Sequence, residues 1–132
     1  MKKLLIKEIK GKGRGVFCTQ LIKKEEIIEV CALLAFPVED TEILLTSQLA
    51  DYFFNFNKDD NTLCLALGFG SLYNHAMYSN AAYHVNSESS AIHFYAIQDI
   101  FPLTEICINY GGEHGREFNE WFEARNIPIS SE

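Results

Sequence analysis

The segment LALGFGSLYNHAMYSNAAYHV, residues 65–85, decides the fold, because an apolar, glycine-spaced run passes directly into Asn74-His75 and then Asn80. Asn and His are poor strand formers, and Asn suits turns because its side chain bonds nearby backbone and tolerates left-handed geometry. Polar residues placed in this way form either a buried knot of hydrogen bonds or the floor of a binding site.

Short apolar runs typical of strands surround this segment. Val, Ile, Phe and Tyr enrich most of the runs, as strands require. The runs are LLIKEI (4–9), GVFCT (15–19), EIIEVCALLAF (26–36), LCLALGFG (63–70), AAYHV (81–85), AIHFYAI (91–97) and EICINY (105–110). NSES (86–89) predicts a hairpin turn, and only TEILLTSQLADYFF (41–54) and EFNEWFEARN (117–126) are typical of helices. Many short strands with few helices predict a mostly-β fold and exclude a Rossmann architecture.

The length of 132 residues allows a real hydrophobic core, and we expect a single domain that spans residues 1–132. The composition, 48% hydrophobic and 22% charged, is that of a globular protein. No stretch approaches the roughly 18 apolar residues of a membrane span. Lys7 and Glu8 interrupt the start before a signal-peptide core of roughly 7–15 apolar residues can form. We therefore expect a protein that is cytoplasmic, or is delivered to the nucleus of a host cell, and that does not enter a membrane.

The four cysteines are widely spaced and form no C-x-x-C pair. Most lie in apolar, strand-like runs, where a free cysteine behaves as a small hydrophobic residue. We predict that Cys18, Cys31, Cys64 and Cys107 pack in the core of a protein from a reducing compartment, and bind neither zinc nor each other.

Charge is distributed unevenly along the chain. The first 24 residues hold eight Lys and Arg residues and one acidic residue, Glu8, so their charge is +7. Because the whole chain has a net charge of −7, the remaining residues carry −14. An acidic body attracts basic partners and discourages nucleic acid. The alternative reading is a solvated surface that only keeps the protein soluble.

Two further motifs are weak when taken alone. GKGRGVF (11–17) lacks the residue order of a P-loop, and its Gly13-x-Gly15 fits either a hairpin turn or a close approach to a ligand. Tyr110 ends an apolar strand before two glycines, so it either plugs the end of a sheet or directs its phenol into a cleft. His75, His84 and His93 lack the spacing and the acidic or cysteine partners of a metal site.

In their order along the chain, Gly13-x-Gly15, Asn74-His75 with Asn80, and a strand that ends in Tyr110-Gly111 resemble the motifs of the SET-domain lysine methyltransferases. That family carries a G-x-G turn, an N-H-S-x-x-P-N segment and a late E-x-x-x-x-Y-G strand, and the resemblance covers about residues 6–111. The chain is most similar to small bacterial and viral SET proteins. It departs from the pattern at Ala76, where Ser is usual, at Ser79, where Pro is usual, and at Thr104-Glu105, which replaces paired acids.

The resemblance implies a SET fold of several short sheets with a C-terminal pseudoknot, and S-adenosyl-L-methionine as cofactor. It further implies that Tyr110 and Tyr83 are catalytic, and that the cofactor is bound by Gly13, Arg14, Gly15, Asn74, His75, Tyr110 and Trp121. The lysine channel would be lined by Tyr52, Tyr83, Ile108 and Phe122. Residues 112–132 would close the site in place of the zinc-binding cysteines of larger members. No metal is implied.

The substrate implied is a basic, lysine-bearing protein, with histone tails among the candidates, and a core this small allows a homodimer. Ile108 stands where family members often carry Phe or Tyr, which indicates a roomier pocket for the amine. Two alternatives stay open: a SET-like module that binds a basic peptide without methylating it, and a metal-dependent hydrolase that uses the histidines. The enzyme is the reading that the motifs favour.

Overall fold

The fold was analysed in a computed structural model, which describes residues 3–11, 13–57, 62–115 and 117. Strands dominate the described part of the chain, so the mostly-β prediction is confirmed. The strands are β1 (Leu4–Ile9), β2 (Gly13–Cys18), β3 (Ile27–Ala35), β4 (Phe53–Asn57), β5 (Thr62–Ala66), β6 (Asn74–His75), β7 (Ala81–Asn86), β8 (Ala91–Ala96) and β9 (Glu105–Ile108). The helical elements are α1 (Thr41–Leu45) and the 3₁₀ turns η1 (Val38–Asp40) and η2 (Gln48–Asp51).

The chain divides into two compact units, and each is described by itself. Unit 1 comprises Met1–Glu29, Leu72–Tyr83 and Phe94–Glu132, and unit 2 comprises Val30–Ser71 and His84–His93. The strands β3, β7 and β8 begin in one unit and end in the other.

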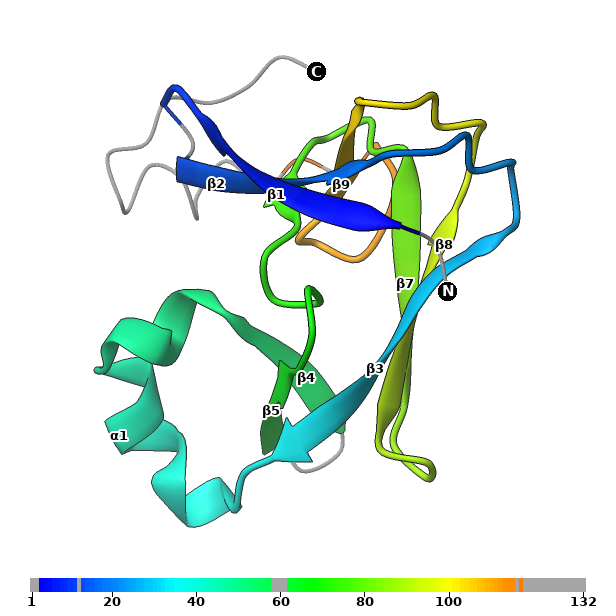
Figure 1. The fold of residues 1–132 in the computed structure, drawn as a ribbon. Coiled ribbons are helices and arrows are strands. Elements are labelled where there is room, and N and C mark those ends of the chain that lie inside the picture. Colours follow the sequence, from blue (N-terminus) through cyan, green and yellow to red (C-terminus); the bar gives the residue numbers. More distant parts are fainter. Residues whose placement is uncertain (1–2, 12, 58–61, 116, 118–132) are drawn as a thin grey trace. The chain divides into compact units, whose positions relative to one another are not determined.

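A four-stranded sheet in the order β1-β2-β9-β6 forms the framework of unit 1, and Figure 1 labels its strands β1, β2 and β9. The antiparallel hairpin of β1 and β2 places Ile9 opposite Gly13. Gly11 and Gly13 have φ of 84° and 79°, a left-handed conformation that only glycine adopts at little cost, so they make the turn. On its far side β2 pairs antiparallel with β9, and β6 joins β9 in parallel. The sheet thereby brings together three segments that are far apart in the sequence.

Aliphatic and aromatic side chains fill the core of unit 1. The fully buried ones come from the strands, where Ile106 and Ile108 occupy alternate positions of β9, and from the loops between strands. They include Val16, Ile22, Ile28, Tyr73, Phe94, Ile100, Ile106 and Ile108. An isolated bridge between Ile22 and Ile100, with both backbone hydrogen bonds at 2.7 and 2.9 Å, joins the loops that precede β3 and β9.

The second sheet has the order β4-β5-β3-β8-β7. Within unit 2, Leu33 of β3 lies opposite Ala66 of β5. The hairpin turn that NSES predicts is confirmed between β7 and β8. There the Asn86 side chain accepts hydrogen bonds from the backbone N–H groups of Glu88 and Ser89, at 3.1 and 3.2 Å.

The predicted helix over residues 41–54 is wrong at its end. Helical structure stops at Asp51, and β4 begins at Phe53. Phe53 and Phe54 pair with Leu65 and Cys64 of β5, and this strand pairing outweighs the local helical pattern. The second predicted helix, residues 117–126, lies outside the described residues except for Glu117.

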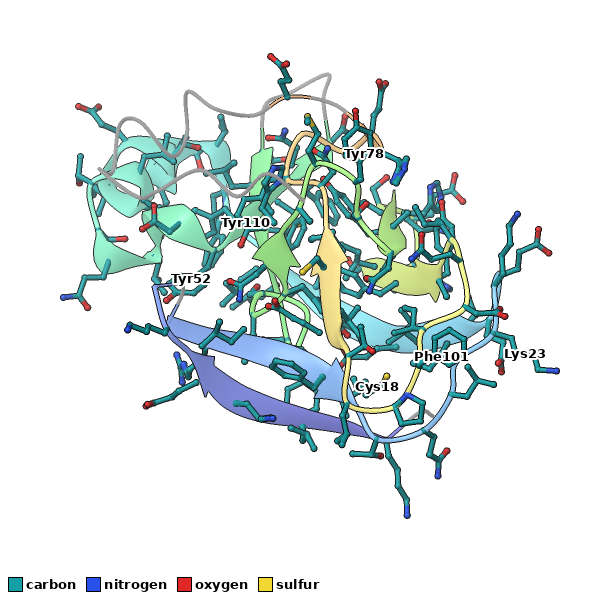
Figure 2. The ribbon with its side chains drawn as sticks, turned by 90° about the horizontal axis from the view of Figure 1, so that it is seen from above. Cys18, Lys23, Tyr52, Tyr78, Phe101 and Tyr110 are labelled. Carbon is teal, nitrogen blue, oxygen red and sulfur yellow. The ribbon has the colours of Figure 1, made fainter. Side chains whose placement is uncertain are left out.

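All four cysteines are free and buried, which confirms their predicted core packing. Burial raises the pKa of the Cys18 thiol, and it raises the pKa of Cys64 to about 11. Cys18 donates from its thiol to the Phe101 carbonyl at 3.2 Å, and Figure 2 shows the two residues close together. Within the described ranges, no helix is long and apolar enough to cross a membrane.

Candidate active site

The three motifs that the sequence singles out meet in the sheet of unit 1. Gly13-x-Gly15 begins β2, Asn74-His75 is β6, and the strand that leads to Tyr110 is β9. Because β9 lies between β2 and β6, the glycine motif and the amide pair flank the same strand. In the parallel pairing, Asn74 lies opposite Cys107 and His75 opposite Ile108.

The two positions of the motif require glycine for different physical reasons. Gly13 needs its positive φ, and a Cβ built there meets nothing within 4 Å, so the space beside it is open. Gly15 has ordinary backbone geometry but no room for a side chain. A Cβ at Gly15 would lie 2.5 Å from Glu105 Oε2 and 3.0 Å from Asn74 Nδ2, and would also collide with the Ile9 side chain. The second glycine therefore makes space for side chains of the protein itself.

The side-chain amide of Asn74 is held by two acceptors. Its Nδ2 donates to the Arg14 carbonyl at 2.8 Å and to Glu105 Oε2 at 2.7 Å. Because both neighbours only accept hydrogen bonds, the nitrogen must face them, and Oδ1 points the other way. In the described part of the chain Oδ1 accepts no hydrogen bond, and no fully buried side-chain polar atom lacks a partner, so Oδ1 is at least partly accessible.

His75 is tied to the backbone that follows β9. Its Nδ1 accepts a hydrogen bond from the Tyr110 N–H at 2.9 Å, and the two rings lie 5.2 Å apart. A ring nitrogen that accepts carries no proton, so this contact requires a neutral imidazole protonated at Nε2. The next residue, Ala76, continues the connection with its N–H bonded to the Ile108 carbonyl at 3.0 Å. His75 is thus placed to support Tyr110.

The hydroxyl of Tyr110 is anchored rather than free in water. It donates to the Tyr73 carbonyl at 2.9 Å, in a half-buried position just after β9, and Tyr110 is labelled in Figure 2. Because its one proton is directed at that carbonyl, the phenol oxygen can act only as an acceptor toward any other group. This hydrogen bond fixes the orientation of the hydroxyl, and the catalytic role of Tyr110 stays a prediction.

Aromatic rings pack around the residue that anchors Tyr110. Tyr73 is buried, packs its ring at a tilt against Phe94 with 4.6 Å between ring centres, and donates from its own hydroxyl to buried Glu29 at 2.7 Å. Tyr83 also packs against Phe94, with 6.2 Å between the ring centres. Its hydroxyl lies 3.6 Å from the position of a Cβ on Gly112, two residues beyond Tyr110. The structure therefore brings Tyr83 to the same aromatic group as Tyr110.

Two asparagines fix the backbone of β9 and of the loop after it. Asn80 donates to the Glu105 carbonyl at 2.8 Å and accepts from the Cys107 N–H at 2.9 Å. Asn109 is buried, donates to the Met77 carbonyl at 3.2 Å and accepts from the Gly111 N–H at 2.8 Å. The Gly115 N–H also reaches the Met77 carbonyl. The loop after β9 is thus bonded back to the segment after β6.

Several predicted site residues do not take part in this convergence. Ile108 is buried in β9, and its channel role stays a prediction. Tyr52 belongs to unit 2, follows η2 and is 38% exposed. Arg14 contributes its carbonyl, while its side chain is exposed. Trp121 and Phe122 lie outside the described residues.

The sequence analysis missed Glu105, Tyr73 and Glu29 as site residues. Glu105 had a signal, because it opens the E-x-x-x-x-Y-G strand, but no role was assigned to it. Tyr73 and Glu29 are separated by 44 positions and have no shared motif. Among the described residues, no group of three or more His, Cys, Asp or Glu is arranged to hold a metal ion.

Comparison with known proteins identifies this arrangement as that of a small β-rich transferase domain. The SET domain family model matches residues 13–111. A Schizosaccharomyces pombe histone-lysine N-methyltransferase, specific for H3 lysine 37, is 31% identical over 121 residues, which cover 91% of this chain and 77% of the yeast protein. The chain therefore belongs to the SET domain family of protein-lysine methyltransferases, as its motifs predicted.

Solved structures agree with this assignment. A candidate histone methyltransferase of Plasmodium falciparum is 32% identical, with a TM-score of 0.67, over 84% of this chain and 99% of the other. Polycomb Repressive Complex 2 of Chaetomium thermophilum, in an autoinhibited conformation bound to S-adenosylmethionine, gives a TM-score of 0.70 over 98% of this chain and 18% of its own. At 19% identity the latter match shows the fold alone.

Proposed function

We propose that this chain transfers methyl groups from S-adenosylmethionine to lysine side chains of a basic protein, and that histone is the substrate class. The observation that carries the proposal is the anchored phenol of Tyr110, placed by β9 beside the strand that presents Asn74. The yeast relative acts on histone H3, and the acidic remainder of this chain, at −14, favours a similarly basic partner.

The residues present fit the amino-acid end of the cofactor. Asn74 presents an accessible carbonyl oxygen, which is the right partner for an ammonium group. The open space beside Gly13 leaves room for a ligand against the backbone of β2. We assign cofactor binding to Gly13, Arg14, Asn74 and His75, with the backbone of His75 beside the adenine. When bound, the cofactor supplies an electrophilic methyl group on a sulfonium.

The chain itself must align the amine and keep it neutral. In-line displacement depends on alignment of the nitrogen with the methyl carbon, and rigid positioning supplies much of the acceleration. The Tyr110 oxygen, with its proton directed at the Tyr73 carbonyl, offers lone pairs to the methyl and to the amine as positive charge develops. An apolar aromatic surround lowers the pKa of a lysine from its ordinary value of about 10.4. Tyr83, which packs against buried Phe94, provides part of such a surround and is assigned to hydrogen-bond the amine.

The direct test is incubation of the purified chain with isotope-labelled S-adenosylmethionine and a panel of histones and cell-lysate proteins, followed by mass spectrometry. We expect mass increments of whole methyl groups on lysine residues, mainly in basic proteins. A SET-like module that only binds basic peptides would retain the histone and incorporate no label. The Tyr110→Phe variant serves as the background control.

Replacement of Asn74 by Ala is expected to weaken cofactor binding about tenfold, which is the scale of one lost hydrogen bond to a charged group. The reason is the loss of the only accessible amide oxygen on β6. Isothermal titration calorimetry with S-adenosylmethionine measures the effect, and a thermal melt checks that the variant is folded. Affinity equal to that of the unmodified protein would remove Asn74 from the site.

A further inference from the structure

Glu105 lies under the amide that is assigned to bind the cofactor. It opens β9, is half-buried, and its Oε2 accepts from Asn74 Nδ2 at 2.7 Å. The second acceptor of that nitrogen is the Arg14 carbonyl at 2.8 Å. The two acceptors together use both hydrogens of the amide group, so they fix which end of the amide faces outward.

An Asn side chain can rotate its amide by half a turn, because this torsion is broad and roughly two-fold. With the nitrogen outward, the amide would present hydrogens to an ammonium group and repel it. The carbonyl of Arg14 accepts one hydrogen of Nδ2, and the carboxylate of Glu105 accepts the other, so without Glu105 one hydrogen would lack its acceptor. The hydrogen bond from Asn74 to Glu105 therefore stabilises the amide orientation in which the Asn74 oxygen points outward.

The glycine motif is built around this pair. The position of a Cβ on Gly15 is already taken by Glu105 Oε2 and Asn74 Nδ2, at 2.5 and 3.0 Å. Asn80 holds the start of β9 by its bond to the Glu105 carbonyl, so the carboxylate projects from a fixed backbone. Three separate segments thus converge on one hydrogen bond between side chains.

We propose that Glu105 is a positioning residue that gives the site its selectivity for the cationic amino group of the cofactor, acting through Asn74. This inference rests on the proposed function, since it assigns a role within the same site. The carboxylate acts by geometry, because its hydrogen bond to Nδ2 holds the amide oxygen of Asn74 outward.

The test compares binding of S-adenosylmethionine with binding of its analogue that lacks the α-amino group, by calorimetry. Glu105→Met keeps the length of the side chain and removes both oxygens, while Glu105→Gln restores one oxygen acceptor. Glu88→Ala, an exposed glutamate in the turn between β7 and β8, is the matched control. Thermal melts accompany each variant, and Glu105→Ala takes the place of the Met variant if that protein does not fold.

We expect Glu105→Met to weaken binding of S-adenosylmethionine about fivefold to tenfold and to leave the deamino analogue within about twofold, on the scale of one hydrogen bond to a charged group. Glu105→Gln should recover most of the loss. In the double variant with Asn74→Ala, the affinity should match that of Asn74→Ala alone, because the two residues act as one unit. At saturating cofactor, turnover of Glu105→Met should stay within about twofold.

Equal losses for both ligands would overturn the inference, because they would show that Glu105 only supports the fold. Losses that multiply in the double variant would overturn it as well. If the unmodified protein bound neither ligand, the proposed function itself would fail. Normal binding by the unmodified protein together with normal binding by Glu105→Met removes only the role of Glu105.

Discussion

A Tyr110→Phe variant will bind S-adenosylmethionine with nearly unchanged affinity and will lose turnover on the order of a hundredfold or more. The substitution removes one oxygen, and that oxygen is held by its hydrogen bond to the Tyr73 carbonyl at 2.9 Å. A preorganised dipole stabilises charge that develops in the transition state without any reorganisation, so its loss acts on the reaction step. The ring and its contact with His75 remain.

The stability cost of this variant should be small. The Tyr73 carbonyl loses its donor, and an unmade hydrogen bond at a half-buried position costs about 1 kcal/mol. Turnover is measured with saturating cofactor and a histone mixture, and affinity by calorimetry. Tyr78→Phe is the matched control, because Tyr78 is 61% exposed and contacts His114 rather than the group around Tyr73. Turnover near that of the control would exclude Tyr110 from the chemistry.

The strands could be predicted from the sequence because their signals are local. LLIKEI corresponds to β1 residue for residue, and the hairpin of Asn86 to Ala91 follows from a side chain that bonds its own turn. β4 could not be predicted in this way. Its phenylalanines continue an apolar pattern that also suits a helix, and only the pairing with β5 decides between the two.

The sequence predicted which motif residues belong to the candidate site, but it could not predict the hydrogen bonds between them. The order of Gly13-x-Gly15, Asn74-His75 and Tyr110 identified the family, because each motif is contiguous. The bonds that join them link positions 31 to 60 residues apart, as in Asn74 with Glu105 and Asn74 with the Arg14 carbonyl. Such pairs follow from the strand order β1-β2-β9-β6, which no local pattern encodes. For the same reason, Gly15 was read as a turn or ligand-approach glycine.

Gly15→Ala, the smallest change in the motif, tests this new reading of the glycine. Strand propensity alone favours Ala over Gly by about 0.5–1 kcal/mol. The added methyl, however, collides with the Ile9 side chain and lies 2.5 Å from Glu105 Oε2. These atoms lie at the ends of side chains that can move, so we expect the side chains to shift. The loss of folding stability should then be near the lower end of the 1–3 kcal/mol typical of overpacking. The movement separates Glu105 from Asn74, so the main effect of the substitution should be weaker cofactor binding.

We therefore expect Gly15→Ala to fold, with a modestly lower melting temperature, and to bind S-adenosylmethionine about tenfold more weakly, the same loss as Asn74→Ala, since Glu105 and Asn74 act as one unit. Gly11→Ala is the control: Gly11 has φ of 84° and nothing within 4 Å, so the substitution costs about 1 kcal/mol of backbone strain and displaces no side chain. Calorimetry and urea unfolding of both variants separate the two effects. If Gly15→Ala lost stability as Gly11→Ala does and kept its affinity, the space at Gly15 would serve the fold and not the cofactor.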